Sequence, residues 1–118
     1  ALAFRENGGL ILATKNGFAF WDFTKQSLQF IVDPEADKPQ SRFNDGAVDR
    51  NGRFWAGTMG DDENNALYRL DPDGSLHTME KNVIIANGIG WSPDNKTMYF
   101  TDSPRNTIYA YDYDAATG

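Results

Sequence analysis

Two asparagines in matching surroundings are the residues of this sequence best suited to bind a ligand. Asn44 lies in the string RFNDG, and Asn87 lies 43 positions later in the string ANGI. An asparagine side chain offers a carbonyl oxygen suited to Ca²⁺ or Mg²⁺ and an amide group that can hydrogen-bond a ligand. Both strings are also ordinary turn sequences, because Asn and Gly tolerate a positive φ. The turn interpretation is the stronger one for either residue alone, and the shared position in two repeats brings ligand contact level with it.

Charged groups near these asparagines could extend a ligand site. The guanidinium of Arg42 can hold a carboxylate, a phosphate or vicinal hydroxyls, and in an extended chain it lies on the same face as Asn44. A surface arginine paired with a nearby acid is the alternative. Asp45 could add charge or orient a water. The acidic run at 61–63 offers a substrate contact at Asp62, although such a run can also be a solvated loop.

The sequence has no cysteine, one histidine and a formal net charge of -6. A disulfide framework, a thiolate zinc site, a cysteine nucleophile and a multi-histidine metal site are therefore excluded. A Ser/His/Asp triad would have to use His77, whose alternation with Leu76 predicts a surface position on an outer strand. The sequence has no block of basic residues of the kind that binds nucleic acid. No apolar run approaches the ~20 residues of a membrane helix. We expect a cytoplasmic protein without nucleic-acid or membrane partners.

A repeat of 43 or 44 residues must position the asparagines. Three segments align: LAFRENGGLILAT at 2–14, AVDRNGRFWAGT at 47–58 and GWSPDNKTMYFTD at 90–102. Each reads as a strand, a polar turn and a second strand, which predicts a hairpin. A second strand pair follows each hairpin, at 17–32, at 66–79 and from Ile108 onward.

Four strands per repeat of roughly 40 to 50 residues is typical of a β-propeller blade. A β-sandwich also has many short strands, but it has no reason to repeat its turn chemistry at this period. In a propeller the first strand of each blade lines the central channel. Turns just ahead of those strands would bring Asn44 and Asn87 to one axial site, while Trp21, Trp55 and Trp91 would pack between blades.

The longest matching strings carry a resemblance to a known family. RFNDGAVDRNGRFWAGTM (42–59) and ANGIGWSPDNKTMYFTDS (86–103), followed by IYAYDYD (108–114), resemble the senescence marker protein, gluconolactonase and luciferin-regenerating enzyme family, which includes the regucalcins. The resemblance extends over essentially the whole chain. It implies an all-β, six-bladed propeller that hydrolyses sugar lactones. It also implies one divalent cation in the central channel, most readily Ca²⁺, with Zn²⁺, Mg²⁺ or Mn²⁺ as alternatives.

Residue roles follow from the resemblance by position. Asn87 matches the metal-ligating asparagine of the family, and Arg42 and Asn44 match its substrate-binding residues. Asp62 falls where some members place a substrate-contacting glutamate. The family's metal-ligating glutamate, and the aspartate that is both ligand and proposed general base, have no match here, so we expect no catalytic residue in this chain.

The length of 118 residues supplies about two and a half blades of four antiparallel strands. We therefore expect residues 1–118 to be the central blades of a larger propeller, with the closing blades elsewhere and little activity in isolation. A non-catalytic Ca²⁺-binding or interaction module with the same blades is the alternative function. The open ends of a partial propeller expose apolar blade faces, so self-association or a complementary chain could close the ring.

Overall fold

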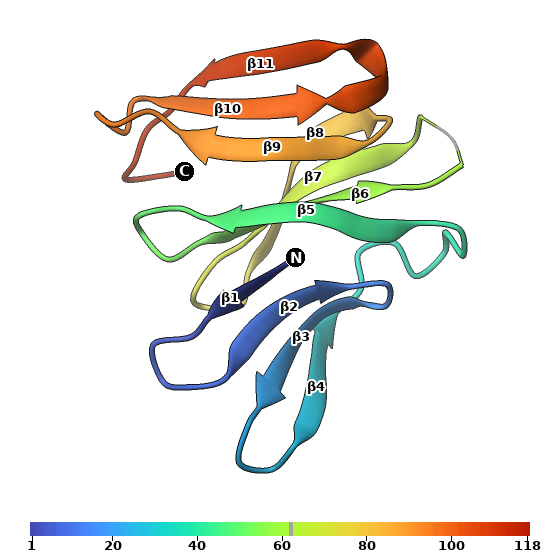
Figure 1. The fold of residues 1–118 in the computed structure, drawn as a ribbon, viewed down its shortest axis with the longest axis vertical. Helices are drawn as coiled ribbons and strands as arrows, with labels where there is room; N and C mark the ends of the chain where they lie inside the picture. Colours follow the sequence, from blue (N-terminus) through green and yellow to red (C-terminus); the bar gives the residue numbers. More distant parts are fainter. Residues whose placement is uncertain (62) are drawn as a thin grey trace.

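The computed structural model describes residues 1–61 and 63–118 as three antiparallel sheets (Figure 1). The first sheet contains β1 (Leu2–Phe4), β2 (Leu10–Thr14), β3 (Gly17–Asp22) and β4 (Ser27–Val32). The second contains β5 (Arg42–Val48), β6 (Phe54–Met59), β7 (Asn65–Leu70) and β8 (Leu76–Val83). The third contains β9 (Ala86–Trp91), β10 (Thr97–Asp102) and β11 (Thr107–Asp112), and a 3-10 turn (Ser103–Arg105) precedes β11.

Each sheet is a meander in which strands adjacent in sequence pair antiparallel. The predicted hairpins are confirmed, because β1 pairs with β2, β5 with β6, and β9 with β10. The second strand pairs are present in the first two sheets as β3 with β4 and β7 with β8. In the third sheet the strand predicted from Ile108 onward is β11, which pairs with β10. The predicted all-β class is therefore confirmed, with sheets of four, four and three strands among the described residues. No helical structure in them has the length and apolar character of a membrane span.

The described residues form two apolar cores, one at each junction between sheets. The first core joins the first and second sheets and centres on Phe18, whose ring lies 4.5 Å from that of Phe43 and 5.9 Å from that of Phe54. Full burial of one such ring stabilises the fold by roughly 2 to 3 kcal/mol. These apolar side chains lie at the junction between the two sheets, so they are buried because one sheet stacks on the next.

The second core joins the second and third sheets through aromatic side chains. Trp55 lies 5.9 Å from Trp91 and 6.3 Å from Tyr113, measured between ring centroids. The prediction that these two tryptophans pack between blades is confirmed. Trp21 belongs to neither core and is half-buried on the first sheet.

A buried carboxylate closes the second core from one end. Asp49 Oδ2 accepts hydrogen bonds from Tyr113 Oη at 2.7 Å and Trp55 Nε1 at 3.1 Å, and an ion pair joins it to Arg53 Nε at 3.0 Å. Burial opposes the ionisation of Asp49, but hydrogen bonds from Tyr113, Arg53 and Trp55 outweigh it and hold the pKa of the carboxyl below its ordinary value. Desolvation of the phenol, together with the hydrogen bond to Asp49, raises the pKa of Tyr113 to about 12.

The first strands of the three sheets, which we call the inner strands, lie next to one another. β5 is adjacent to β9, and β1 approaches β5 on its other side (Figure 1). The sheets fan out from these strands toward β4, β8 and β11. Side chains on the inner strands are therefore those that different sheets can bring together.

Candidate functional site

A β-bulge in each of two inner strands shapes the candidate site. In β5 the pairing with β6 shifts by one residue at Asn44 and Asp45, which together lie opposite Gly57. In β9 the pairing with β10 shifts at Gly88 and Ile89. A bulge bends the strand and re-aims its side chains without ending the ladder.

These bulges correct the predicted placement of the asparagines. The sequence interpretation put both residues in turns ahead of the first strands, whereas Asn44 lies inside β5 and Asn87 is the second residue of β9. Gly88 has the positive φ of 57° that an Asn-Gly string favours, but it adopts this φ within a bulge. The prediction was wrong because a bulge and a turn satisfy the same local backbone preference.

The two asparagine amides meet across β5 and β9. Asn44 Nδ2 donates to Asn87 Oδ1 at 3.1 Å and to the carbonyl oxygen of Ala86 at 2.9 Å. Asn87 Nδ2 donates to Ser103 Oγ at 2.8 Å. Each amide therefore has a fixed orientation, and Asn87 Oδ1 keeps a second lone pair for another partner.

Asp45 joins the same two strands through the backbone. Its Oδ2 accepts from the amide N–H of Gly88 at 2.8 Å, and its Oδ1 accepts from the N–H of Gly46 at 2.9 Å. Both carboxylate oxygens are thus engaged in holding the bulges together. This geometry gives Asp45 a structural role beside the amide pair.

Gly57 permits the close approach of the second and third sheets. A Cβ atom built on Gly57 would lie 2.1 Å from Ala86 Cβ, far inside van der Waals contact. The missing side chain lets β9 approach closely enough for Asn44 to reach the carbonyl of Ala86. Sequence reasoning missed this residue, although an isolated glycine within a strand is a known sign of close backbone approach.

Arg42 begins β5 and is exposed. Among the described residues it makes one hydrogen bond, from Nη1 to the carbonyl oxygen of Phe43 at 3.2 Å, and no ion pair. Most of its guanidinium N–H groups therefore face solvent within the described part of the chain. Asp62, the other predicted substrate contact, lies outside the described residues.

A divalent cation would find part of a coordination shell here. Ca²⁺ takes roughly six to eight oxygen ligands. Within residues 1–61 and 63–118, no group of three His, Cys, Asp or Glu side chains gathers in a way that could hold a metal ion. Asn87 Oδ1 is a hard oxygen of fixed orientation, so it fits as one ligand of such a cation. The other ligands would be supplied from elsewhere.

His77 lies on the exposed surface of β8, as predicted. Its Nε2 is 3.2 Å from Ser75 Oγ and 3.3 Å from Asp71 Oδ2. A serine triad needs the serine and the aspartate on opposite ring nitrogens. Because both oxygens contact the same nitrogen, this trio does not have the geometry of a catalytic triad.

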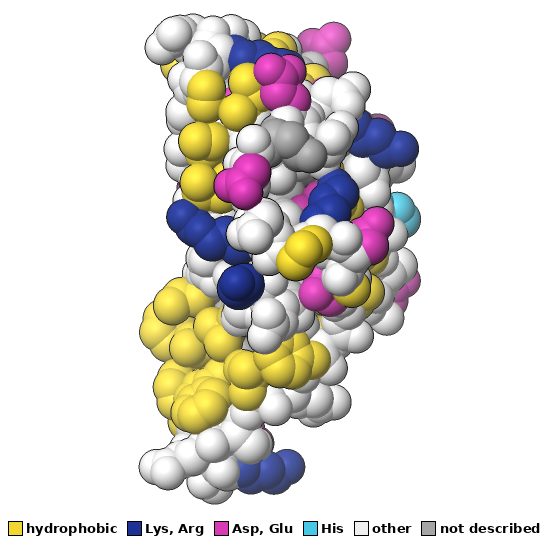
Figure 2. Space-filling model, turned by 90° about the vertical axis from the view of Figure 1, so that its right-hand side faces the viewer, with side chains coloured by type: hydrophobic (Ala, Val, Ile, Leu, Met, Phe, Trp, Pro, Cys, Tyr) yellow, Lys and Arg dark blue, Asp and Glu magenta, His cyan; other side chains and the backbone are white. Residues whose placement is uncertain are grey.

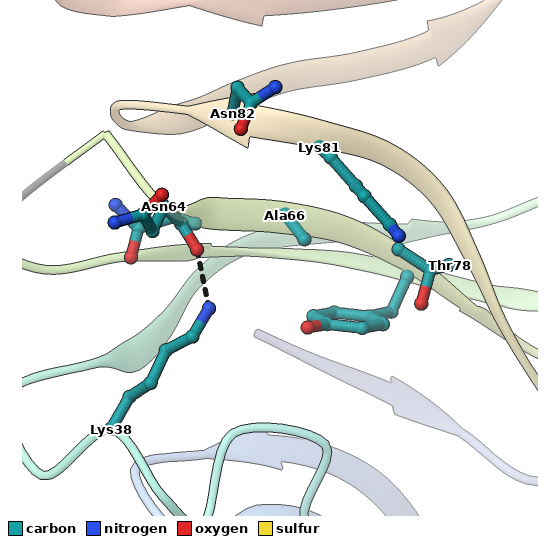
Figure 3. A pocket seen from close by; sticks show the side chains of 8 residues that line it. Lys38, Asn64, Ala66, Thr78, Lys81 and Asn82 are labelled. Atoms are coloured by element: carbon teal, nitrogen blue, oxygen red, sulfur yellow. Dashed lines mark hydrogen bonds between the residues drawn. The ribbon is translucent and has the colours of Figure 1, made fainter.

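A separate pocket of about 460 Å³ opens beside β7 and β8 (Figure 3), and the described residues that line it do not include Asn44 or Asn87. Lys38, Asn64, Thr78, Lys81 and Asn82 are among its lining residues, and Lys38 Nζ donates to the carbonyl oxygen of Asn64. Its described lining includes two amines, three amides and the hydroxyls of Thr78 and Tyr68, but no carboxylate or histidine. The pocket therefore offers binding groups without a general base.

Consecutive antiparallel meanders, stacked face to face and converging on a polar inner edge, define part of a β-propeller. All 118 residues match the model of the SMP-30/Gluconolactonase/LRE-like region, and the chain belongs to this family. Family membership and the all-β partial propeller predicted from the sequence are thus confirmed.

Named relatives agree with this assignment. Regucalcin of Danio rerio is 41% identical over 119 residues, which cover 97% of this chain and 40% of that protein. YvrE of Bacillus subtilis, assigned as a sugar lactone lactonase, is 37% identical over 121 residues, covering 100% of this chain and 41% of that protein. The chain therefore spans about two fifths of the length of the curated relatives it matches.

Solved structures show the same fold. Regucalcin of Agrobacterium tumefaciens, described as a calcium-binding protein, superimposes with a TM-score of 0.91 and 30% identity, covering 99% of this chain and 40% of that one. A luciferin-regenerating enzyme gives a TM-score of 0.85 and 33% identity, with 98% and 42% covered.

Proposed function

We propose that this chain is part of a divalent-cation-dependent enzyme that hydrolyses sugar lactones. The observation that carries the proposal is the Asn44–Asn87 amide pair, fixed at 3.1 Å between two inner strands of a family member. Assignment of YvrE as a sugar lactone lactonase supports the reaction class. The description of Agrobacterium tumefaciens regucalcin as calcium-binding supports the cation.

In this proposal Asn87 holds the cation through Oδ1. A bound divalent cation polarises the lactone carbonyl and stabilises the negative charge that develops on its oxygen. Asn44 and Ser103 keep the Asn87 amide in one orientation, since each hydrogen-bonds a different end of it. Loss of either partner would remove one of the two hydrogen bonds that fix the orientation of this amide.

Arg42 and Asn44 bind the sugar in the same scheme. The exposed guanidinium of Arg42 presents several N–H donors in one plane, a geometry that suits vicinal hydroxyls. Water adds to the lactone carbonyl carbon, the ring C–O bond breaks, and a hydroxy acid forms. The carboxylate that removes the proton from water lies outside this chain in our proposal, because Asp45 is engaged by two backbone N–H groups.

Lactone hydrolysis by the whole protein to which this segment belongs tests the proposal. We expect EDTA and Asn87→Ala each to lower the rate at least about tenfold, the lower range for loss of groups that support a metal site. Asn7→Ala, at an exposed loop position, is the matched control and should retain the rate. Full turnover in the presence of EDTA would contradict the proposal, and robust turnover by the monomeric 118-residue chain would contradict placement of the base outside it.

A non-catalytic Ca²⁺-binding propeller is the second candidate. It is favoured by the description of Agrobacterium tumefaciens regucalcin as a calcium-binding protein. Calcium binding that is lost in Asn87→Ala, in a whole protein that hydrolyses no sugar lactone, would support this candidate over the enzyme.

A further inference from the structure

Four asparagine–glycine steps occur in the sequence, and one of them contains Asn87, the residue proposed to hold the cation. The steps begin at Asn7, Asn16, Asn51 and Asn87. Asparagine followed by glycine is prone to deamidation, because glycine has no side chain to hinder its backbone nitrogen. Deamidation of Asn87 would replace the amide group of the candidate site by a carboxylate.

Deamidation is an attack by the backbone nitrogen of the following residue on the side-chain carbonyl carbon of asparagine. A bond forms between this nitrogen and Cγ, the nitrogen gives up its proton, and the side-chain nitrogen leaves as ammonia. Water then opens the resulting succinimide ring at one of its two carbonyl carbons, and aspartate or isoaspartate forms. The attack therefore requires a backbone nitrogen that can lose its proton and an amide group that can turn toward it.

The backbone nitrogen of Gly88 is held by a carboxylate. Its N–H donates to Asp45 Oδ2 at 2.8 Å, a charge-assisted hydrogen bond between two inner strands. A negative charge beside a group opposes the loss of a proton from that group. The proton that must leave during the attack on Asn87 is thus the one that Asp45 holds in place.

The amide group of Asn87 is held at both ends. Its Oδ1 accepts from Asn44 Nδ2 at 3.1 Å, and its Nδ2 donates to Ser103 Oγ at 2.8 Å. Asn87 also pairs with Thr101 in the ladder between β9 and β10. Both side-chain hydrogen bonds must therefore be given up before the amide can turn toward the nitrogen of Gly88.

Local geometry favours glycine at position 88. Gly88 has a φ of 57°, in the left-handed region, and a Cβ atom built on it would lie 2.6 Å from Thr101 Oγ1. A bulkier residue that would slow deamidation would therefore strain the bulge in β9. Because the reactive pair follows from the shape of the strand, its protection has to come from neighbouring residues.

The other three asparagine–glycine steps lack these restraints. The N–H of Gly52 donates to the backbone carbonyl oxygen of Asp49 at 3.1 Å, and this acceptor carries no net charge. Within residues 1–61 and 63–118, the side-chain amides of Asn7, Asn16 and Asn51 form no hydrogen bond. These three amides can therefore turn toward the following nitrogen without breaking a contact of that kind.

We propose that the carboxylate of Asp45 protects Asn87 from deamidation, and that the chain deamidates first at the other three steps. Asn44 and Ser103 support this protection, because they fix the amide group that would be attacked. Every contact in the arrangement lies within or between the second and third sheets, which this chain contains. The proposal does not depend on lactone hydrolysis.

Slow conversion of asparagine in the whole protein to which this segment belongs tests the proposal. The protein is kept at mildly alkaline pH, and tandem mass spectrometry of its peptides locates each asparagine that has become aspartate or isoaspartate. Asn87 should convert at least about tenfold more slowly than Asn16 and Asn51, the factor expected for a hydrogen bond to a charged group. Conversion of Asn87 at the rate of those two residues would overturn the proposal.

Two variants of Asp45 separate its charge from its shape. Asp45→Ala removes the acceptor and should raise the conversion rate of Asn87 at least about tenfold. Asp45→Asn keeps the shape and an oxygen acceptor but removes the charge, so it should raise the rate by a smaller factor. An unchanged rate in Asp45→Asn would contradict protection by the charge. A slower rate in Asp45→Ala would show that the carboxylate acts as a base, which is the opposite of the proposal.

A control variant removes a negative charge elsewhere on the molecule. Figure 2 shows acidic side chains at several separate places on one face, so loss of a surface charge must be tested by itself. Asp37→Ala, in the exposed loop between β4 and β5, should leave the conversion of Asn87 unchanged. The rates at Asn16 and Asn51 should also stay unchanged in the Asp45 variants. An equal rise at all three asparagines would indicate a general loosening of the fold and would exclude specific protection by Asp45.

Discussion

Replacing Gly57 with alanine should break the contact between the second and third sheets at the amide pair. The new Cβ would lie 2.1 Å from Ala86 Cβ, whereas real Cβ atoms essentially never approach other atoms within 3.0 Å. Both methyl groups are attached directly to the backbone, so neither can rotate away. The strands β6 and β9 must therefore move apart, which also lengthens the hydrogen bond from Asn44 to the carbonyl of Ala86.

The structure sets the size of the effect. Overpacking of a core costs about 1 to 3 kcal/mol, and two rigid methyl groups place Gly57→Ala at the upper end, about 3 kcal/mol of unfolding free energy. Ala86→Gly alone should cost about 1 kcal/mol through the greater backbone freedom of glycine. The double variant moves the methyl group from one strand to the other. Its new Cβ would meet Ala66 O at 3.5 Å, an ordinary contact.

The double variant should therefore lose about 1 kcal/mol where independent effects would sum to about 4 kcal/mol, a coupling of about 3 kcal/mol. Urea unfolding followed by tryptophan fluorescence measures it, because Trp55 and Trp91 lie at this junction. Gly90→Ala is the matched control on β9, since its Cβ would meet open space. Additive losses in the double variant would refute the close-approach argument, and so would an unchanged stability of Gly57→Ala.

Three further predictions concern protonation, buried hydrogen bonds and the amide pair. Hydrogen bonds hold the pKa of Asp49 below its unfolded value. The ionised carboxylate therefore adds to the free energy of unfolding above about pH 4, and this contribution is lost as the pH falls through the depressed pKa. In urea unfolding at several pH values, the free energy of unfolding of Asp49→Asn should fall less steeply with acid than that of the unmodified protein. Asp102→Ala should lower the unfolding free energy by about 3 kcal/mol in thermal unfolding, because the buried carboxylate accepts hydrogen bonds from two backbone N–H groups at 3.1 Å each. The control Glu6→Ala, at an exposed position, should change the unfolding free energy by no more than about 0.5 kcal/mol. Ser103→Ala should cost less than about 1 kcal/mol of unfolding free energy. It should nevertheless lower lactone turnover of the whole protein about tenfold, because it frees the amide of Asn87. Unchanged turnover would show that Ser103 does not position Asn87.

Local sequence patterns predicted most of the architecture. The polar turns ENGG, RNGR and PDNK, with apolar alternation on both sides, placed the three hairpins correctly. Burial of Trp55 and Trp91 between sheets also followed from composition and repeat. These features depend on residues close together in the chain, where backbone preference and period-two alternation act.

The sequence by itself determined the strands, the repeat, the family and the equivalence of Asn44 and Asn87. Only the tertiary structure decided that both asparagines lie within strands at bulges, and that their amides hydrogen-bond each other. It also decided that Gly57 must lack a side chain. The physical reason is that a bulge and a contact between residues 43 positions apart depend on how one sheet packs against the next, which no local preference specifies.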